Sequence, residues 1–140
     1  MPGYPQAPAA TVNKSAEETF TDIAKIEATR LVSARTPDSG LPVWLIDCPV
    51  LFARRGGPYQ DETAPTGPDN ARRFALLSRV AARLSYGTLA PKWQPDIVYA
   101  NDWHTGLLPL LLEAKGRAGS AYRTSDSGHD RWSWLGKSTR

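Results

Sequence analysis

The spacing of apolar residues predicts the clearest helix of the chain just after Asp69. Apolar side chains recur there every three or four positions, at Phe74, Leu77, Val80, Ala81 and Leu84. The arginines of the same stretch fall largely on the opposite side, at Arg72, Arg73, Arg79 and Arg83. Asp69 can cap the first turn, because backbone amides at a helix start lack partners. The pattern indicates an amphipathic helix with one face directed at a core.

Two apolar stretches nearer the N-terminus favour strands. Residues 24–34 alternate apolar and polar positions, and residues 41–52 are rich in branched and aromatic side chains. The turn-forming sequence at 36–40 lies between them and predicts a hairpin whose second strand ends near Asp47. Ser15 and Glu18 also have the spacing of a helix capping box. We therefore expect a short turn or helix first and then the strands.

A short strand and a second helix are expected further along. Residues 97–100 are apolar and follow a turn, and residues 105–116 form an apolar helical stretch that Gly116 can cap. Pro109 falls within about one turn of the start of this helix, where a missing N–H does least harm. Helix, strand and helix in this order predict a βαβ-type unit with a parallel sheet. The expected fold class is therefore α/β.

Two stretches predict no regular structure. Residues 54–70 form a long loop, since they contain the breakers Gly56, Gly57, Pro58, Pro65, Gly67 and Pro68. Residues 118–140 are rich in Ser, Arg, Gly and Asp and have no apolar period, so we expect a disordered or loosely attached tail. The chain is thus expected to consist of one incomplete domain, residues 1–117, followed by the tail.

Composition narrows the class of protein. The 140 residues, 41% of them hydrophobic, suffice for one domain with a core. The net charge of +3 comes from scattered basic residues, so a nucleic-acid partner is not expected. No apolar run reaches the length of a membrane span and no export signal is visible at the N-terminus. The single cysteine, Cys48, fits a buried thiol in a reducing compartment. We expect a soluble cytoplasmic protein with no membrane partner.

Candidate chemistry gathers where the expected strand at 97–100 ends and the next helix begins. In open α/β folds ligands bind at this edge of the sheet. The carboxylate of Asp102 can accept hydrogen bonds from sugar hydroxyls, the indole of Trp103 can pack on a sugar ring, and the imidazole of His104 can transfer a proton. Asn101 adds an amide that can donate and accept. Alternatively, Asp102 only caps the helix, Trp103 fills the core and His104 lies at the surface.

The loop at 54–70 offers weaker chemistry. Tyr59 and Asp61 lie there, with glycines such as Gly57 that allow close backbone approach. The loop lacks the glycine spacings of a phosphate-binding loop, so by itself it is interpreted as a solvated connection. His104 and His129 are far apart in the sequence and there is one cysteine, so no metal site and no cofactor are expected. No nucleophile elbow is present.

Three stretches together resemble one known family. Residues 43–61 (VWLIDCPVLFARRGGPYQD), 68–84 (PDNARRFALLSRVAARL) and 95–116 (PDIVYANDWHTGLLPLLLEAKG) are similar, in unbroken order, to the N-terminal half of bacterial glycogen synthases and plant starch synthases. The resemblance implies a Rossmann-like half of a two-domain glycosyltransferase of the GT-B type. It also implies transfer of glucose from ADP-glucose to the non-reducing end of an α-1,4-glucan, with retention of configuration.

The resemblance also implies roles for particular residues. Asp102 and Trp103 would line the cleft on the glucosyl and acceptor side, with His104 shaping the same loop. In the Gly-Pro-Tyr-x-Asp motif, Tyr59 is the residue expected to reach the nucleotide or the sugar. The candidate catalytic residues are Asp102 and His104. The candidate substrate-binding residues are Trp103, Asn101, Tyr59, Asp61 and Gly57.

The chain departs from the family pattern at both ends. The family's Lys-Thr-Gly-Gly loop should precede residue 1, and its Val-His-Asn-Leu segment should follow Gly116, where this chain has a different sequence. We therefore expect a fragment of such an enzyme that is inactive alone. Two alternatives stay open: a non-catalytic glucan-binding module that uses Trp103 and Tyr59, and a basic protein that binds polyanions.

Overall fold

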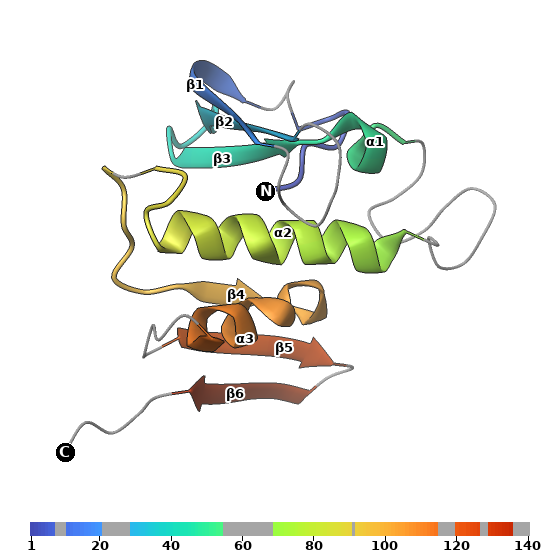
Figure 1. The fold of residues 1–140 in the computed structure, drawn as a ribbon, viewed down its shortest axis with the longest axis vertical. Helices are drawn as coiled ribbons and strands as arrows, with labels where there is room; N and C mark the ends of the chain where they lie inside the picture. Colours follow the sequence, from blue (N-terminus) through green and yellow to red (C-terminus); the bar gives the residue numbers. More distant parts are fainter. Residues whose placement is uncertain are drawn as a thin grey trace. The chain divides into compact units, whose positions relative to one another are not determined.

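The structure is a computed structural model that describes residues 1–7, 11–20, 29–54, 69–90, 92–114, 120–126 and 129–135 (Figure 1). The chain divides into two compact units, Met1–Arg73 and Phe74–Arg140. The division falls inside helix α2 (Asn70–Ser85), whose first turn belongs to the first unit. Each unit is described by itself below.

The first unit is built on a three-stranded sheet of order β1-β2-β3. The strands are β1 (Val12–Phe20), β2 (Thr29–Arg35) and β3 (Pro42–Asp47). The turn between β2 and β3 closes with a 3.0 Å hydrogen bond from the Gly40 amide to the Thr36 carbonyl. Gly40 has a φ of 66°, a value that glycine adopts without strain. The expected hairpin, and its end at Asp47, are confirmed.

One expectation for this unit is wrong. Residues around Ser15 form β1 rather than a turn or helix, because pairing with β2 along most of the strand outweighs a local capping signal. The sheet is antiparallel throughout, in agreement with the expected hairpin. A turn as short as the one between β2 and β3 can join only antiparallel neighbours, whereas parallel strands need a longer crossover.

The core of the first unit lies against this sheet. Its buried cluster comprises Ala7, Val32, Ala34 and Leu45, with Val43 packed beside it. A short helix that the sequence did not predict, α1 (Pro49–Phe52), follows β3 and buries Leu51 and Phe52. Cys48, directly before this helix, is a buried free thiol, as expected. Burial of these side chains removes apolar surface from water and so stabilises the unit.

The first residues of the chain extend the sheet on its free side. Pro2 forms a parallel bridge with Ile46 of β3. The Ile46 amide donates to the Met1 carbonyl at 2.9 Å, and the Gly3 amide donates to the Ile46 carbonyl at 2.8 Å. A Cβ atom on Gly3 would lie 2.8 Å from the Ile46 carbonyl oxygen. The close approach therefore requires a glycine at position 3.

The second unit contains the rest of α2, as predicted, and a sheet of order β4-β5-β6. Its elements after α2 are β4 (Tyr99–Asn101), the 3-10 turn η1 (Trp103–Thr105), α3 (Leu107–Ala114), β5 (Ser120–Asp126) and β6 (His129–Leu135). Strands β4 and β5 are parallel and α3 connects them, so a βαβ unit is present, although its second strand lies in the segment where no strand was expected. Strand β6 is antiparallel to β5.

Helices α2 and α3 and strand β4 share a core in this unit. Its buried members are Ala82, Ala100, Leu108 and Leu112. Tyr86, just after α2, donates its hydroxyl to the carbonyls of Leu111 and Leu112 at 2.8 and 2.9 Å. The last carbonyls of a helix have no partner within the helix, so the tyrosine both caps α3 and ties it to α2.

The expected disorder of residues 118–140 is not confirmed, because β5 and β6 lie within this segment. The segment has no apolar period, and its strands arise from pairing with β4 and with each other. The domain boundary at residue 117 stays a prediction. In the described part of the chain, no helix has the length and apolar character that a membrane crossing requires.

Candidate functional site

The predicted residues Asn101, Asp102, Trp103 and His104 lie where β4 gives way to η1. Asn101 is the last residue of the strand, Asp102 is the single residue between the two elements, and η1 begins at Trp103. The residues therefore stand at the carboxyl end of a strand that pairs in parallel with β5. This is the position where open α/β sheets bind ligands.

Asp102 has an unusual backbone. Its φ of 68° and ψ of 167° lie in a region that is almost restricted to glycine, and no other described non-glycine residue has a positive φ. Its carboxylate Oδ1 accepts a 2.6 Å hydrogen bond from the Trp103 amide, so Asp102 does cap η1. A residue in this region carries about 1–3 kcal/mol of strain, and such strain clusters at functional sites.

His104 faces the other oxygen of the same carboxylate. Its Nδ1 lies 3.8 Å from Asp102 Oδ2, and both side chains are about three-quarters buried, with exposed fractions of 21% and 23%. This distance is too long for a hydrogen bond. When the imidazole is protonated, however, the two groups attract each other as an ion pair in a partly desolvated setting.

Trp103 is exposed, which rules out the interpretation that it fills the core. Its side chain keeps 55% of its surface accessible. The ring of Phe74, in α2, meets the indole edge to face with centroids 4.9 Å apart, and it lies 5.7 Å from the ring of His104. Such aromatic pairs add about 0.5–1.5 kcal/mol beyond their buried area. Phe74 thus packs against both Trp103 and His104, and part of the indole surface remains exposed to solvent.

Sequence reasoning placed Phe74 on the apolar face of its helix and did not connect it with the triplet. No spacing signal exists for such a contact, since the two positions lie on separate elements. Thr105 was also not singled out. Its hydroxyl lies 2.9 Å from the carbonyl oxygen of Asn101 and 2.8 Å from that of Asp102. These contacts close the loop around Asp102.

The chemistry of this arrangement suits a ligand rich in hydroxyl groups. A carboxylate provides hydrogen-bond acceptors, an exposed indole offers an apolar face, and an imidazole beside them can exchange a proton. In the described part of the chain, no group of three or more His, Cys, Asp and Glu residues is placed to hold a metal ion.

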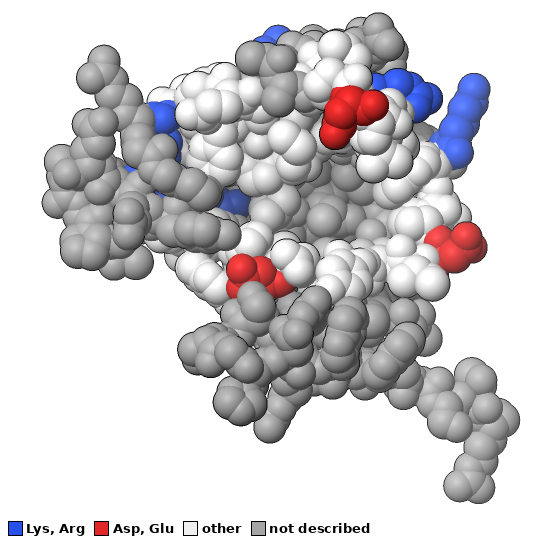
Figure 2. All heavy atoms as spheres, turned by 180° about the vertical axis from the view of Figure 1, so that it is seen from behind, with Lys and Arg blue, Asp and Glu red and all other residues white. Residues whose placement is uncertain are grey.

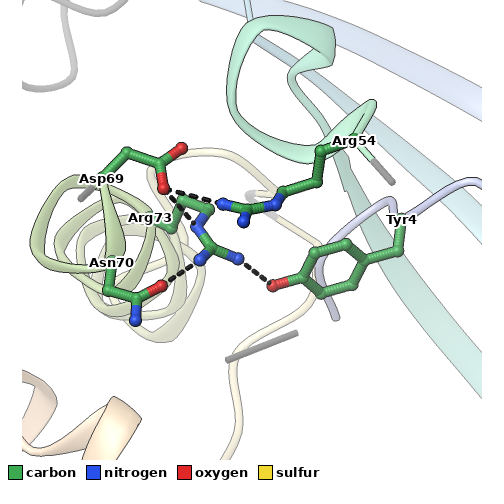
Figure 3. Close-up of polar contacts among 5 residues, drawn as sticks. All are labelled: Tyr4, Arg54, Asp69, Asn70 and Arg73. Atoms are coloured by element: carbon green, nitrogen blue, oxygen red, sulfur yellow. Dashed lines mark hydrogen bonds and ion pairs between the residues drawn. The ribbon is translucent and has the colours of Figure 1, made fainter. Parts of the chain in front are cut away.

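A second polar cluster lies in the first unit (Figure 3). It joins Tyr4, Arg54, Asp69, Asn70 and Arg73. The Arg73 guanidinium is fully buried and donates to the Tyr4 hydroxyl at 2.8 Å and to the Asn70 carboxamide oxygen, while its Nε lies 3.3 Å from Asp69 Oδ1. The expectation that Arg73 belongs to the face opposite the core is wrong. Its charge is buried because three polar partners replace water.

The same carboxylate binds a second arginine. Arg54 Nη1 lies 2.8 Å from Asp69 Oδ1, and the side chains retain exposed fractions of 14% and 30%. This pair joins the two residues that flank the stretch 55–68. Gly57, Tyr59 and Asp61 belong to that stretch and lie outside the described residues, so their roles stay predictions.

The face drawn in Figure 2 shows how the described charged side chains are distributed on one side of the molecule. Figure 2 shows the described Lys and Arg side chains scattered over the face that it presents, with acidic side chains among them, and no continuous basic patch among the described residues there. Counterion release by a polyanion requires several basic groups aligned with its charges. On this face, the described residues therefore offer no continuous basic surface for the basic-protein alternative.

Comparison with known proteins places these observations in a family. A family model described as the starch synthase catalytic domain matches residues 1–127. The glycogen synthase of Paramagnetospirillum magneticum is 51% identical over 116 residues, which cover 81% of this chain and 23% of that protein. The glycogen synthase of Burkholderia thailandensis is 42% identical over 118 residues, covering 84% and 22%. That of Dechloromonas aromatica is 47% identical over 127 residues, covering 86% and 24%.

These matches extend over most of the chain but over a small part of each relative. The chain spans about a quarter of the length of the curated relatives that it matches. The family match also includes residues up to 127, beyond the end of the resemblance at Gly116 that the sequence motifs indicated.

Proposed function

Because the chain belongs to the starch synthase catalytic domain family, we propose that it supplies part of the active site of a glycogen or starch synthase. In this proposal, glucose passes from ADP-glucose to the non-reducing end of an α-1,4-glucan with retention of configuration, in a protein of the GT-B type. One observation carries the proposal. The strained Asp102 stands beside the exposed indole of Trp103 at the carboxyl end of a parallel strand.

The residues have separate proposed roles. The Asp102 carboxylate accepts hydrogen bonds from sugar hydroxyls and places negative charge where positive charge develops on the reacting sugar. The exposed face of Trp103 packs against a glucosyl ring, and the Asn101 amide adds polar contacts. His104, whose Nδ1 lies 3.8 Å from Oδ2, attracts the carboxylate when the imidazole is protonated and is available for proton transfer. Gly57, Tyr59 and Asp61 are proposed to complete the substrate contacts.

We further propose that the chain alone does not catalyse transfer. Stabilisation of a charged transition state requires donor, acceptor and charged groups fixed together, and this chain corresponds to about a quarter of its relatives' length. The purified chain is incubated with ADP-glucose and glycogen, and ADP release is measured. Release equal to a protein-free control is expected. Turnover that scales with protein concentration would contradict this part of the proposal.

A chimera tests the transfer activity itself. The aligned stretch of the Paramagnetospirillum magneticum glycogen synthase is replaced by the matching residues of this chain. The chimera is expected to transfer glucose to glycogen, and Asp102→Asn is expected to lower kcat by about 100-fold or more. Parallel assays with ADP-glucose and UDP-glucose test the donor, and NMR of the first-formed product tests retention. A chimera that binds glycogen but shows the same kcat with Asp102→Asn would refute the role of the carboxylate.

The exposure of Trp103 favours a second candidate, a glucan-binding module without catalysis. Migration in native gels containing glycogen measures the affinity. Trp103→Ala is expected to weaken retention by about tenfold, because an aromatic face is lost. Trp93→Ala is the matched control, since Trp93 is also an exposed tryptophan of the second unit. Equal retention of all three proteins would exclude Trp103 as a glucan contact.

A further inference from the structure

The loop that carries the candidate site contains a residue whose conformation needs support. Asp102, at φ 68° and ψ 167°, occupies a backbone region that disfavours any side chain. Such a residue persists only where surrounding contacts hold it, since rotation about φ or ψ would relieve the strain. The contacts that oppose this rotation must act on the peptide groups to either side of Asp102.

Thr105 makes those contacts. Its Oγ1 lies 2.9 Å from the Asn101 carbonyl oxygen and 2.8 Å from the Asp102 carbonyl oxygen. The first carbonyl precedes the φ rotation of Asp102 and the second follows its ψ rotation. A hydroxyl that shares its proton between these two acceptors therefore fixes their relative orientation. The Thr105 amide also donates to the Asp102 carbonyl at 3.1 Å.

The next residue leaves little room for relaxation. The Gly106 amide donates to the Trp103 carbonyl at 3.0 Å, and a Cβ at position 106 would lie 3.0 Å from that oxygen. The backbone from Asp102 to Gly106 is therefore closed by short contacts. Within this loop, the Thr105 hydroxyl is the side-chain group that bridges both peptides of the strained residue.

We propose that Thr105 is a positioning residue that locks Asp102 in its strained backbone conformation and thereby orients the Asp102 carboxylate and the Trp103 indole. The positioning rests on the described geometry, and its consequence for glucan binding rests on the proposed function. Thr105→Ser keeps the hydroxyl and Thr105→Val keeps the shape without it. The two variants separate hydrogen bonding from packing.

A double-mutant cycle tests the lock directly. Thr105→Val is expected to lower the folding equilibrium constant about tenfold, and Thr105→Ser by less than about threefold. In the background of Asp102→Gly, where no strain is released when these hydrogen bonds are lost, Thr105→Val is expected to lower the constant by more than in the parent. Urea denaturation provides the constants. Equal effects in the two backgrounds would overturn the proposal. If Thr105→Val does not fold in the parent chain, the cycle is repeated with Thr105→Ala, and equal effects of that substitution in the two backgrounds overturn the proposal.

Fluorine NMR of the chain labelled with 5-fluorotryptophan reports on orientation. Trp103→Phe assigns the Trp103 resonance. In Thr105→Val this resonance is expected to move by more than its linewidth while that of Trp93 stays in place, and Thr105→Ser should match the parent. A Trp103 resonance that does not move, or that moves together with the Trp93 resonance, would overturn the proposal.

Retention on glycogen separates the positioning role of Thr105 from the proposed glucan site. The same variants are compared in native gels that contain glycogen. If Thr105→Val shifts the Trp103 resonance and shows the coupling but retains parental glycogen affinity, the lock stands and the proposed glucan site fails. If Thr105→Val also loses glycogen affinity and Thr105→Ser does not, the positioning role of Thr105 and the glucan site are both supported.

Discussion

Arg73 donates a 2.8 Å hydrogen bond to the hydroxyl of Tyr4, although 69 positions separate the two residues in the sequence. The guanidinium is fully buried, and Asp69 balances its charge at 3.3 Å from Nε. One side chain thus ties the beginning of the chain to the start of α2 within the first unit (Figure 3).

Replacing Arg73 should strongly destabilise the first unit. Arg73→Met is expected to lower the free energy of unfolding by about 1–3 kcal/mol, because the Tyr4 hydroxyl and the Asn70 carboxamide lose a buried donor, while Asp69 keeps its ion pair with Arg54. Arg79→Met is the control, since Arg79 is an exposed arginine of the same helix, and a change within about 0.5 kcal/mol is expected. Urea denaturation measures both. Equal effects of the two substitutions would show that the buried network contributes nothing.

At position 102 the backbone conformation should make a glycine variant more stable than an alanine variant, which reverses their usual order of stability. Both Asp102→Ala and Asp102→Gly remove the carboxylate, but only glycine adopts φ 68° and ψ 167° without strain. The glycine variant should therefore be more stable by about 1–3 kcal/mol. At exposed Arg79, inside α2, alanine should instead be more stable than glycine by about 1 kcal/mol. Thermal and urea unfolding measure the stability of the four variants. If the alanine variant is the more stable one at both positions, Asp102 is not strained.

Phe74 should influence ligand binding although it is not proposed to touch a ligand. Phe74→Leu keeps an apolar side chain but removes the ring that meets Trp103 at 4.9 Å. Glycogen affinity is expected to fall by about threefold to tenfold, because the indole loses an aromatic pair that restrains it. Leu77→Ala, on the same helix and partly buried, is a control for general loosening. A larger loss of affinity in the control would show that the effect is not specific to the ring.

The α-amino group of Met1 makes stability depend on pH. Burial lowers the pKa of this amine from 8.0 to about 6, and the amine donates to the Trp44 carbonyl. Between these two pH values the unfolded chain holds more protons than the folded chain, so the free energy of unfolding rises with pH from 6 to 8. Below pH 6 the amine is protonated in both states and the slope vanishes. Urea denaturation across this range measures the effect, and N-terminal acetylation should abolish the part due to Met1.

Sequence patterns predicted the elements whose residues carry their own periodic signal. Helix α2 follows from its apolar spacing, and the β2–β3 hairpin follows from the turn residues before Leu41. The position of Asp102 at the end of β4 also follows, because a strand, a polar triplet and a helix occur in order. Local sequence signals were sufficient to predict these elements.

Features that depend on distant partners did not follow from the sequence. Arginine at position 73 has the signature of a solvated residue, and its burial depends on Tyr4, far away in the chain. The contact between Phe74 and Trp103 likewise joins separate elements. Strand β5 has little apolar character of its own, and its pairing with β4 comes from the fold. A single sequence shows which residues are polar or apolar, but not which partner each will meet.

The first three residues of the chain have a consequence for behaviour at high concentration. An unpaired strand edge can recruit a strand from another molecule and begin aggregation. At Ile46 the outer edge of β3 is already satisfied, since its amide and carbonyl pair with Met1 and Gly3. Because any side chain at position 3 would collide with the Ile46 carbonyl, the glycine is what keeps this edge closed to other molecules.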